Sequence, residues 1–158
     1  MLLLDDSSST ALAVDTVVPA SSAKLHDALV RVWPRLAGRI AVIPGTMDDP
    51  EILDTDVVVS CHACGALTDL VLRRAVDARA RVAVLPCCHD LDAADTGRLS
   101  GWVDGPLAID IMRARRLADE GYRIRTQVIP ADITSRNRLL LGEPVSAGCG
   151  RQSLTRSE

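Results

Sequence analysis

The sequence has very few aromatic residues. It contains two tryptophans, one tyrosine and no phenylalanine in 158 residues. The core is therefore expected to be aliphatic, built from valine, leucine, isoleucine and alanine. Stacking of bases on aromatic side chains, a common way to bind single-stranded nucleic acid, is disfavoured.

Lysine is also scarce, because Lys24 is the only lysine among 18 basic residues. The formal net charge is −3, which gives no overall basic field to attract nucleic acid. No apolar run is long enough to cross a membrane. The N-terminal MLLLDDSSS lacks the basic region and long apolar core of a signal peptide, so the cytoplasm is the expected location.

Five cysteines are an odd number for a disulfide framework in a chain of this length. In a reducing compartment they are better interpreted as thiols or ligands. Four of them lie in two short segments, CHAC at residues 61–64 and PCCH at residues 86–89. The fifth, Cys149, lies in a polar C-terminal stretch and is expected to be incidental.

Strand-like and helix-like segments alternate along the chain. Apolar runs and punctuating Pro or Gly residues predict strands at residues 11–15, 39–43, 56–60 and 81–85, and helices at 22–33, 67–78 and 106–120. Residues 122–129 and 137–141 predict a final antiparallel hairpin. This order predicts an α/β, Rossmann-like fold with a mostly parallel sheet and a C-terminal β-hairpin. We expect one domain over residues 1–144 and a flexible tail over 145–158.

In such a sheet, ligands bind beyond the carboxyl ends of the strands. Two of these ends carry the CHAC and PCCH segments, and a third carries Asp15. Because CHAC and PCCH follow consecutive parallel strands, their thiols and imidazoles are expected to converge on one rim.

The combination of HACGALTD and PCCH resembles one branch of class I S-adenosylmethionine (SAM) methyltransferases. That branch includes the eukaryotic tRNA 2′-O-methyltransferases that carry an added zinc finger. Related bacterial single-domain proteins look closer still, sharing LLDDSS, WPRLAGR, the GW-x-D-G helix and the NRLLLG ending. The similarity extends over nearly the whole chain, to about Pro144.

The resemblance implies SAM as cofactor and a small molecule or RNA as methyl acceptor. Asp15 falls where these enzymes bind the ribose hydroxyls. Gly45, Met47 and Asp48 fall where the adenine lies, with Asp48 as acceptor for its amine and Met47 as apolar contact. The resemblance also implies the following catalytic candidates: His62, Cys64, Cys88 and His89.

The chain departs from the family in one respect, since no G-x-G-x-x-G occurs anywhere in it. In the family, a strand and this glycine-rich loop precede the ribose-binding strand, and residues 1–4 look like the end of the following helix. The chain thus resembles an N-terminally shortened methyltransferase. Loss of a middle strand would expose strand edges, and exposed edges invite pairing, so a homodimer is predicted.

A different class of function stays open. A metal- or thiol-dependent protein on the same scaffold would use some of six candidate zinc ligands, namely Cys61, His62, Cys64, Cys87, Cys88 and His89.

Structural roles stay open as well. Asp15 could cap the turn before the first helix, and Asp69 is expected to stabilise the first turn of its helix. Five arginines are expected on a solvated surface or, alternatively, on a phosphate-facing patch: Arg113, Arg115, Arg116, Arg123 and Arg125.

Overall fold

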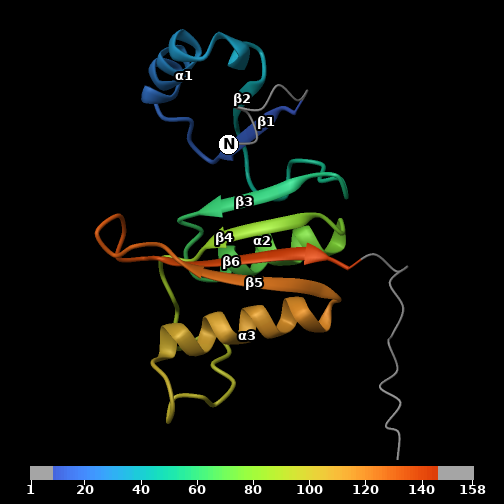
Figure 1. Ribbon diagram of the computed structural model, residues 1–158, viewed down its shortest axis with the longest axis vertical. Helices are drawn as coiled ribbons and strands as arrows, with labels where there is room; N and C mark the ends of the chain where they lie inside the picture. Colours follow the sequence, from blue (N-terminus) through green and yellow to red (C-terminus); the bar gives the residue numbers. More distant parts are fainter. Residues whose placement is uncertain (1–8, 146–158) are drawn as a thin grey trace, which may run out of the picture. The chain divides into compact units, whose positions relative to one another are not determined.

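The computed structural model describes residues 9–145 (Figure 1). The predicted tail, Cys149 and the LLDDSS start lie outside these residues, apart from Val145 at the edge of the tail. The chain divides into two compact units, Met1–Glu51 and Ile52–Glu158. Each unit is described by itself, and a single domain over residues 1–144 stays a prediction.

The first unit is a parallel strand pair with its crossover helix. Its elements are β1 (Ala11–Asp15), α1 (Ser21–Val32), the short 3₁₀ turn η2 (Pro34–Leu36) and β2 (Ile40–Pro44). The register runs from Ala11 opposite Ile40 to Asp15 opposite Pro44. Parallel strands cannot be joined by a tight turn, so α1 is the connection that lets β1 and β2 pair. Asp15 and the residues after Pro44 consequently lie at the same end of the pair.

The second unit is a four-stranded sheet with two helices, which can be followed in Figure 1. Its elements are β3 (Val57–Cys61), α2 (Ala66–Asp77), β4 (Arg81–Leu85), α3 (Gly105–Asp119), β5 (Tyr122–Val128) and β6 (Arg138–Pro144). The strand order is β3-β4-β6-β5. Strands β3 and β4 are parallel, whereas β6 runs antiparallel to both β4 and β5.

The expectation of a mostly parallel sheet is wrong for this unit. The predicted C-terminal hairpin is present, but its second strand inserts beside β4. Both pairings of β6 are therefore antiparallel, and the sheet is mixed. The other parallel pair, β1 with β2, forms a separate two-stranded sheet.

Helices α2 and α3 pack on one face of the four-stranded sheet. Gly142 of β6 lies on that face, close to the side chains of Val82, Leu117 and Tyr122. On the same face, the Tyr122 hydroxyl donates hydrogen bonds to the carbonyls of Ala75 in α2 and Ala80 before β4, both at 3.0 Å. The core is aliphatic around this one tyrosine, as the composition predicts. No helix within the described residues is long and apolar enough to cross a membrane.

Candidate functional site

The two cysteine-bearing segments leave neighbouring strands at the same edge of the sheet. Strands β3 and β4 are parallel and end in register, with Cys61 opposite Leu85. The loop after β3 and the loop after β4 are tied by a backbone hydrogen bond from the Gly65 N–H to the Cys88 carbonyl, at 3.2 Å. The structure therefore brings the CHAC and PCCH segments together.

The loop after β3 has an unusual backbone. His62 has a φ of 66°, a left-handed conformation that is uncommon outside glycine. Gly65 also has a positive φ, 56°, and it precedes the first residue of α2. Thr68, fully buried in the first turn of α2, donates a hydrogen bond from its hydroxyl back to the Ala63 carbonyl. These constraints fix the chain on both sides of Cys64.

Three thiols lie close together where the two loops meet. The Sγ atoms of Cys64 and Cys87 are 3.4 Å apart, and those of Cys87 and Cys88 are 3.7 Å apart. All three sulfur atoms lie within 4.8 Å of one another. Cys87 is buried, whereas Cys64 and Cys88 are exposed.

The thiols change one another's acidity. Hydrogen bonds with Cys88 and then with Cys87 raise the pKa of the Cys64 thiol to about 12. The pKa of Cys88 is lowered from its ordinary value, because its sulfur accepts hydrogen bonds from Cys64 and Cys87 and because the charge of Arg136 is nearby. Cys88 therefore ionises more readily than Cys64.

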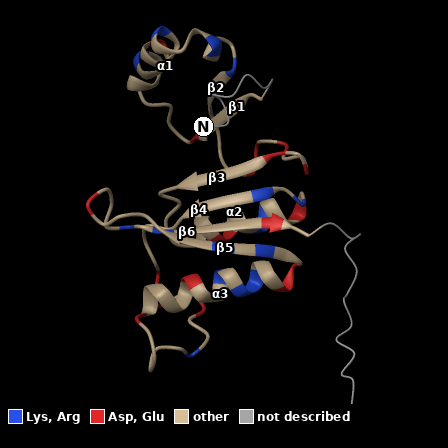
Figure 2. Ribbon diagram, in the orientation of Figure 1, with Lys and Arg blue, Asp and Glu red and all other residues tan. Residues whose placement is uncertain are grey.

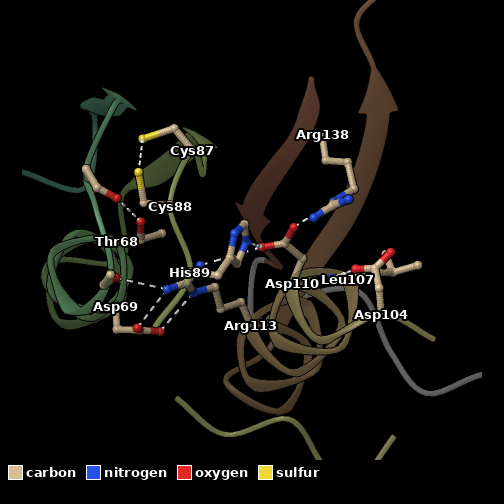
Figure 3. Close-up of polar contacts among 12 residues, drawn as sticks. Thr68, Asp69, Cys87, Cys88, His89, Asp104, Leu107, Asp110, Arg113 and Arg138 are labelled. Carbon is tan, nitrogen blue, oxygen red and sulfur yellow. Dashed lines mark hydrogen bonds and ion pairs between the residues drawn. The ribbon is translucent and has the colours of Figure 1, made fainter. Parts of the chain in front are cut away.

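His89, directly after the thiols, is held by a carboxylate on α3 (Figure 3). Its side chain is 3% exposed, and its Nε2 lies 2.7 Å from Asp110 Oδ1. The other carboxylate oxygen of Asp110 accepts from Arg138 Nε at 2.8 Å. The second ring nitrogen of His89, Nδ1, is buried and has no hydrogen-bond partner within residues 9–145.

One of the arginines expected on the surface of α3 is buried. Charged residues of both signs occur along α3 (Figure 2), yet the Arg113 side chain is only 1% exposed. It donates to both oxygens of Asp69, at 3.1 and 2.9 Å, and to the Gly65 carbonyl at 3.0 Å. The expectation of a solvated Arg113 is wrong, because Asp69, a partly exposed acid in the first turn of α2, pairs with its charge.

The alternative expectation, that these arginines form a phosphate-binding patch, also loses support, because neighbouring arginines of α3 pair with acids. Arg115 lies 2.8 Å from Asp119 and Arg116 lies 3.0 Å from Asp95. Asp69, expected to stabilise a helix terminus rather than to act in catalysis, lies in the first turn of α2 and also binds Arg113.

The cofactor candidates lie in the first unit, at the carboxyl ends of β1 and β2. The Gly45 N–H donates to the Asp15 carbonyl at 2.9 Å. The Asp15 carboxylate accepts from the Thr16 hydroxyl and the Val17 N–H, both at a long 3.4 Å. Asp48 is exposed and Met47 is half-buried.

Sequence reasoning missed Asp49, which lies next to these candidates. Its carboxylate accepts hydrogen bonds from the backbone and hydroxyl of Thr46, which lower its pKa. A Cβ at position 45 would lie 2.8 Å from Asp49 Oδ2, so the absence of a side chain at Gly45 leaves room for this carboxylate.

Of the six residues proposed as alternative zinc ligands, three come together. Among the described residues, the group of close ligand atoms consists of Cys64, Cys87 and Cys88. Cys61 and His62 are exposed outside that group, and His89 is engaged with Asp110. Sequence reasoning also missed Asp110, although its spacing of three residues from Arg113 on one helix is a recognisable signal for a charge pair.

Comparison with known families gives one match. Residues 10–94 match a family model described as a methyltransferase domain. The matched segment runs from β1 past β4, and it contains the cofactor candidates of the first unit and both cysteine-bearing loops. A search of curated proteins finds no match to this chain.

Proposed function

Because the chain belongs to this methyltransferase-domain family, we propose that it transfers a methyl group from SAM to an acceptor whose proton is taken by His89. The family match covers more than half of the 158 residues. The observation that carries the assignment of His89 is its ring, which binds Asp110 through Nε2 while Nδ1 has no hydrogen-bond partner among the residues that the structure describes.

The first unit offers groups that suit the nucleoside of SAM. Asp15 lies at the end of β1, and its two hydrogen bonds are at the long limit for such contacts. Its lone pairs are therefore free to accept from the two vicinal hydroxyls of a ribose. Asp48 would accept from the adenine amine, and Met47 would supply an apolar contact.

When bound, SAM supplies an electrophilic methyl group. The protein's own task is then to position the acceptor and to remove its proton. An ionised Asp110 can only accept hydrogen bonds. Nε2 of His89 therefore carries a hydrogen and donates a hydrogen bond to Asp110. In the neutral imidazole, Nδ1 then holds a lone pair, which is the position where an acceptor hydroxyl or amine would lose its proton.

The interior position of Nδ1 supports this assignment. A buried acceptor atom that lacks a hydrogen bond costs about 1–3 kcal/mol. An acceptor that reached Nδ1 and donated a hydrogen bond to it would recover that energy. Asp110 acts as a positioning residue, because it fixes the ring orientation while Arg138 balances its charge. Catalytic roles for His62, Cys64 and Cys88 stay predictions.

The first test is cofactor binding by calorimetric titration of the full chain with SAM and with its demethylated product. We expect binding to both, and at least about tenfold weaker binding in Asp15→Ala, which loses the diol acceptor. Asp27→Ala is the matched control, since Asp27 is an exposed acid of the same unit. If neither SAM nor its demethylated product gave heat on titration, SAM dependence would be refuted.

The second test separates the role of His89 from a structural one. Transfer of a labelled methyl group is measured to bulk tRNA and to a metabolite extract, which also distinguishes the two acceptor classes. His89→Ala is expected to lower kcat by about 10²–10⁴-fold, and added imidazole to restore part of it. His26→Ala, a change at the half-exposed histidine of α1, is the control. Equal transfer by the two variants would remove His89 from the mechanism.

A further inference from the structure

Three sulfur atoms lie together at the carboxyl edge of β3 and β4, and the proposed methyl transfer does not require them as a group. We propose that Cys64, Cys87 and Cys88 bind one soft metal ion, represented by Zn²⁺, through three thiolates. The proposal is independent of SAM binding, because it rests on the positions of the sulfur atoms.

The distances between the sulfurs suit a single ion. Two thiolates that each lie about 2.3 Å from a tetrahedral ion are about 3.8 Å apart. The observed separations are 3.4 Å for Cys64 to Cys87 and 3.7 Å for Cys87 to Cys88. Adjacent cysteines do not readily bind one ion, but here the backbone already turns the sulfurs of Cys87 and Cys88 to the distance required. Binding would need only a small expansion of the cluster.

The scaffold around the sulfurs holds both loops independently of the thiols. The Gly65 N–H binds the Cys88 carbonyl, and the buried Thr68 hydroxyl binds the Ala63 carbonyl. The Gly65 carbonyl in turn accepts from the buried Arg113. A metal ion would therefore meet ligands that are largely in place, which reduces the ordering cost of binding.

The donor set and its surroundings decide the class of metal. Three sulfur ligands favour zinc, cadmium or copper(I) over magnesium or calcium, which prefer oxygen. Three thiolates around Zn²⁺ carry a net charge of −1, and Arg136 is a nearby cation that offsets it. Cys64 and Cys88 are exposed while Cys87 is buried, so an ion can reach the cluster from solvent.

Metal binding by the reduced full chain, purified without chelator, tests the proposal. Titration with Co²⁺ and Cd²⁺ is followed by the sulfur-to-metal charge-transfer absorption, a readout that does not involve methyl transfer. We expect about one equivalent bound in a tetrahedral, sulfur-rich site. The Cys61→Ser/Cys149→Ser double variant keeps the three thiols of the cluster and should bind as the parent does.

Cys64→Ser and Cys88→Ser should each weaken binding at least about tenfold. Both positions are exposed, so these variants are expected to fold, and circular dichroism of the metal-free proteins checks that they do. Binding of less than about a tenth of an equivalent, or equal loss in the Cys61→Ser/Cys149→Ser variant, would overturn the proposal. SAM titration of the metal-free chain is scored separately, so failure of one proposal leaves the other intact.

Discussion

The buried pair formed by Arg113 and Asp69 should contribute far more to stability than an exposed pair on the same helix. Asp69→Asn removes the negative charge of the closer of the two carboxylates that face a guanidinium only 1% exposed, and leaves Asp110 at 3.5 Å. Asp119→Asn removes the same charge from Arg115, whose side chain is 69% exposed. Both acids accept two hydrogen bonds from their arginine, so the main difference between the two pairs is the burial of the arginine.

The expected magnitudes follow from this difference in exposure. Removing one partner of a buried ion pair costs about 3–5 kcal/mol. The Asp69 side chain keeps 37% exposure and Arg113 retains the Gly65 carbonyl, so the low end, about 3 kcal/mol, applies. The exposed pair spaced by four residues should contribute only about 0.3–0.5 kcal/mol.

Urea unfolding followed by circular dichroism measures both variants. With a slope of about 1–3 kcal/mol per molar urea, Asp69→Asn should lower the midpoint by about 1 M or more. The double variant Asp69→Leu/Arg113→Met should recover much of the loss, because it removes both charges at once. If Asp69→Asn costs no more than Asp119→Asn, the interior role of Arg113 is wrong.

Three further predictions concern other parts of the chain. Burial raises the pKa of Tyr122, so its stabilising effect should be complete below about pH 10 and be lost as the pH rises through the raised folded value. Tyr122→Phe should cost about 1 kcal/mol at neutral pH and remove that alkaline loss, as measured by unfolding across pH. Asp104 caps α3 through Leu107 N–H at 2.8 Å, so Asp104→Ala should lower the unfolding free energy by about 1 kcal/mol while Asp104→Asn should not. Finally, β1 and β3 each pair with one strand among the described residues, and a homodimer stays our prediction. A molecular mass in analytical ultracentrifugation that stays monomeric at all concentrations would contradict it.

Local patterns were sufficient to predict most of the elements. Apolar periodicity and the Pro and Gly residues that end it place the six strands and three α-helices of the described residues within a few residues of their observed bounds, whereas the 3₁₀ turn η2 was not predicted. The position of β6 was not accessible in this way. A hairpin predicts that β5 and β6 pair, but which of them lies beside β4 depends on packing against α2 and α3.

The candidate site shows the same limit. The meeting of CHAC with PCCH follows from two consecutive parallel strands, which a sequence can indicate. The partners of His89 and Asp69 lie on α3, 21 and 44 residues further along the chain. Helical spacing places Arg113 on the same stripe as Ile109 and Leu117, which sets it apart from Arg115 and Arg116. The acid that pairs with it on α2 depends on how α3 lies against α2, which the local pattern does not show.

Gly65 connects these features through its backbone alone. Its N–H binds the Cys88 carbonyl, and its carbonyl accepts from Arg113. Its φ of 56° and ψ of −126° belong to a conformation that is essentially restricted to glycine. Side-chain truncation cannot delete such a junction, since glycine has nothing to remove, and an alanine scan of the site would pass over it. Any substitution there would disturb the three thiols and the buried Arg113 together. The proposed metal binding and methyl transfer would then both weaken, although the Gly65 side chain takes part in neither.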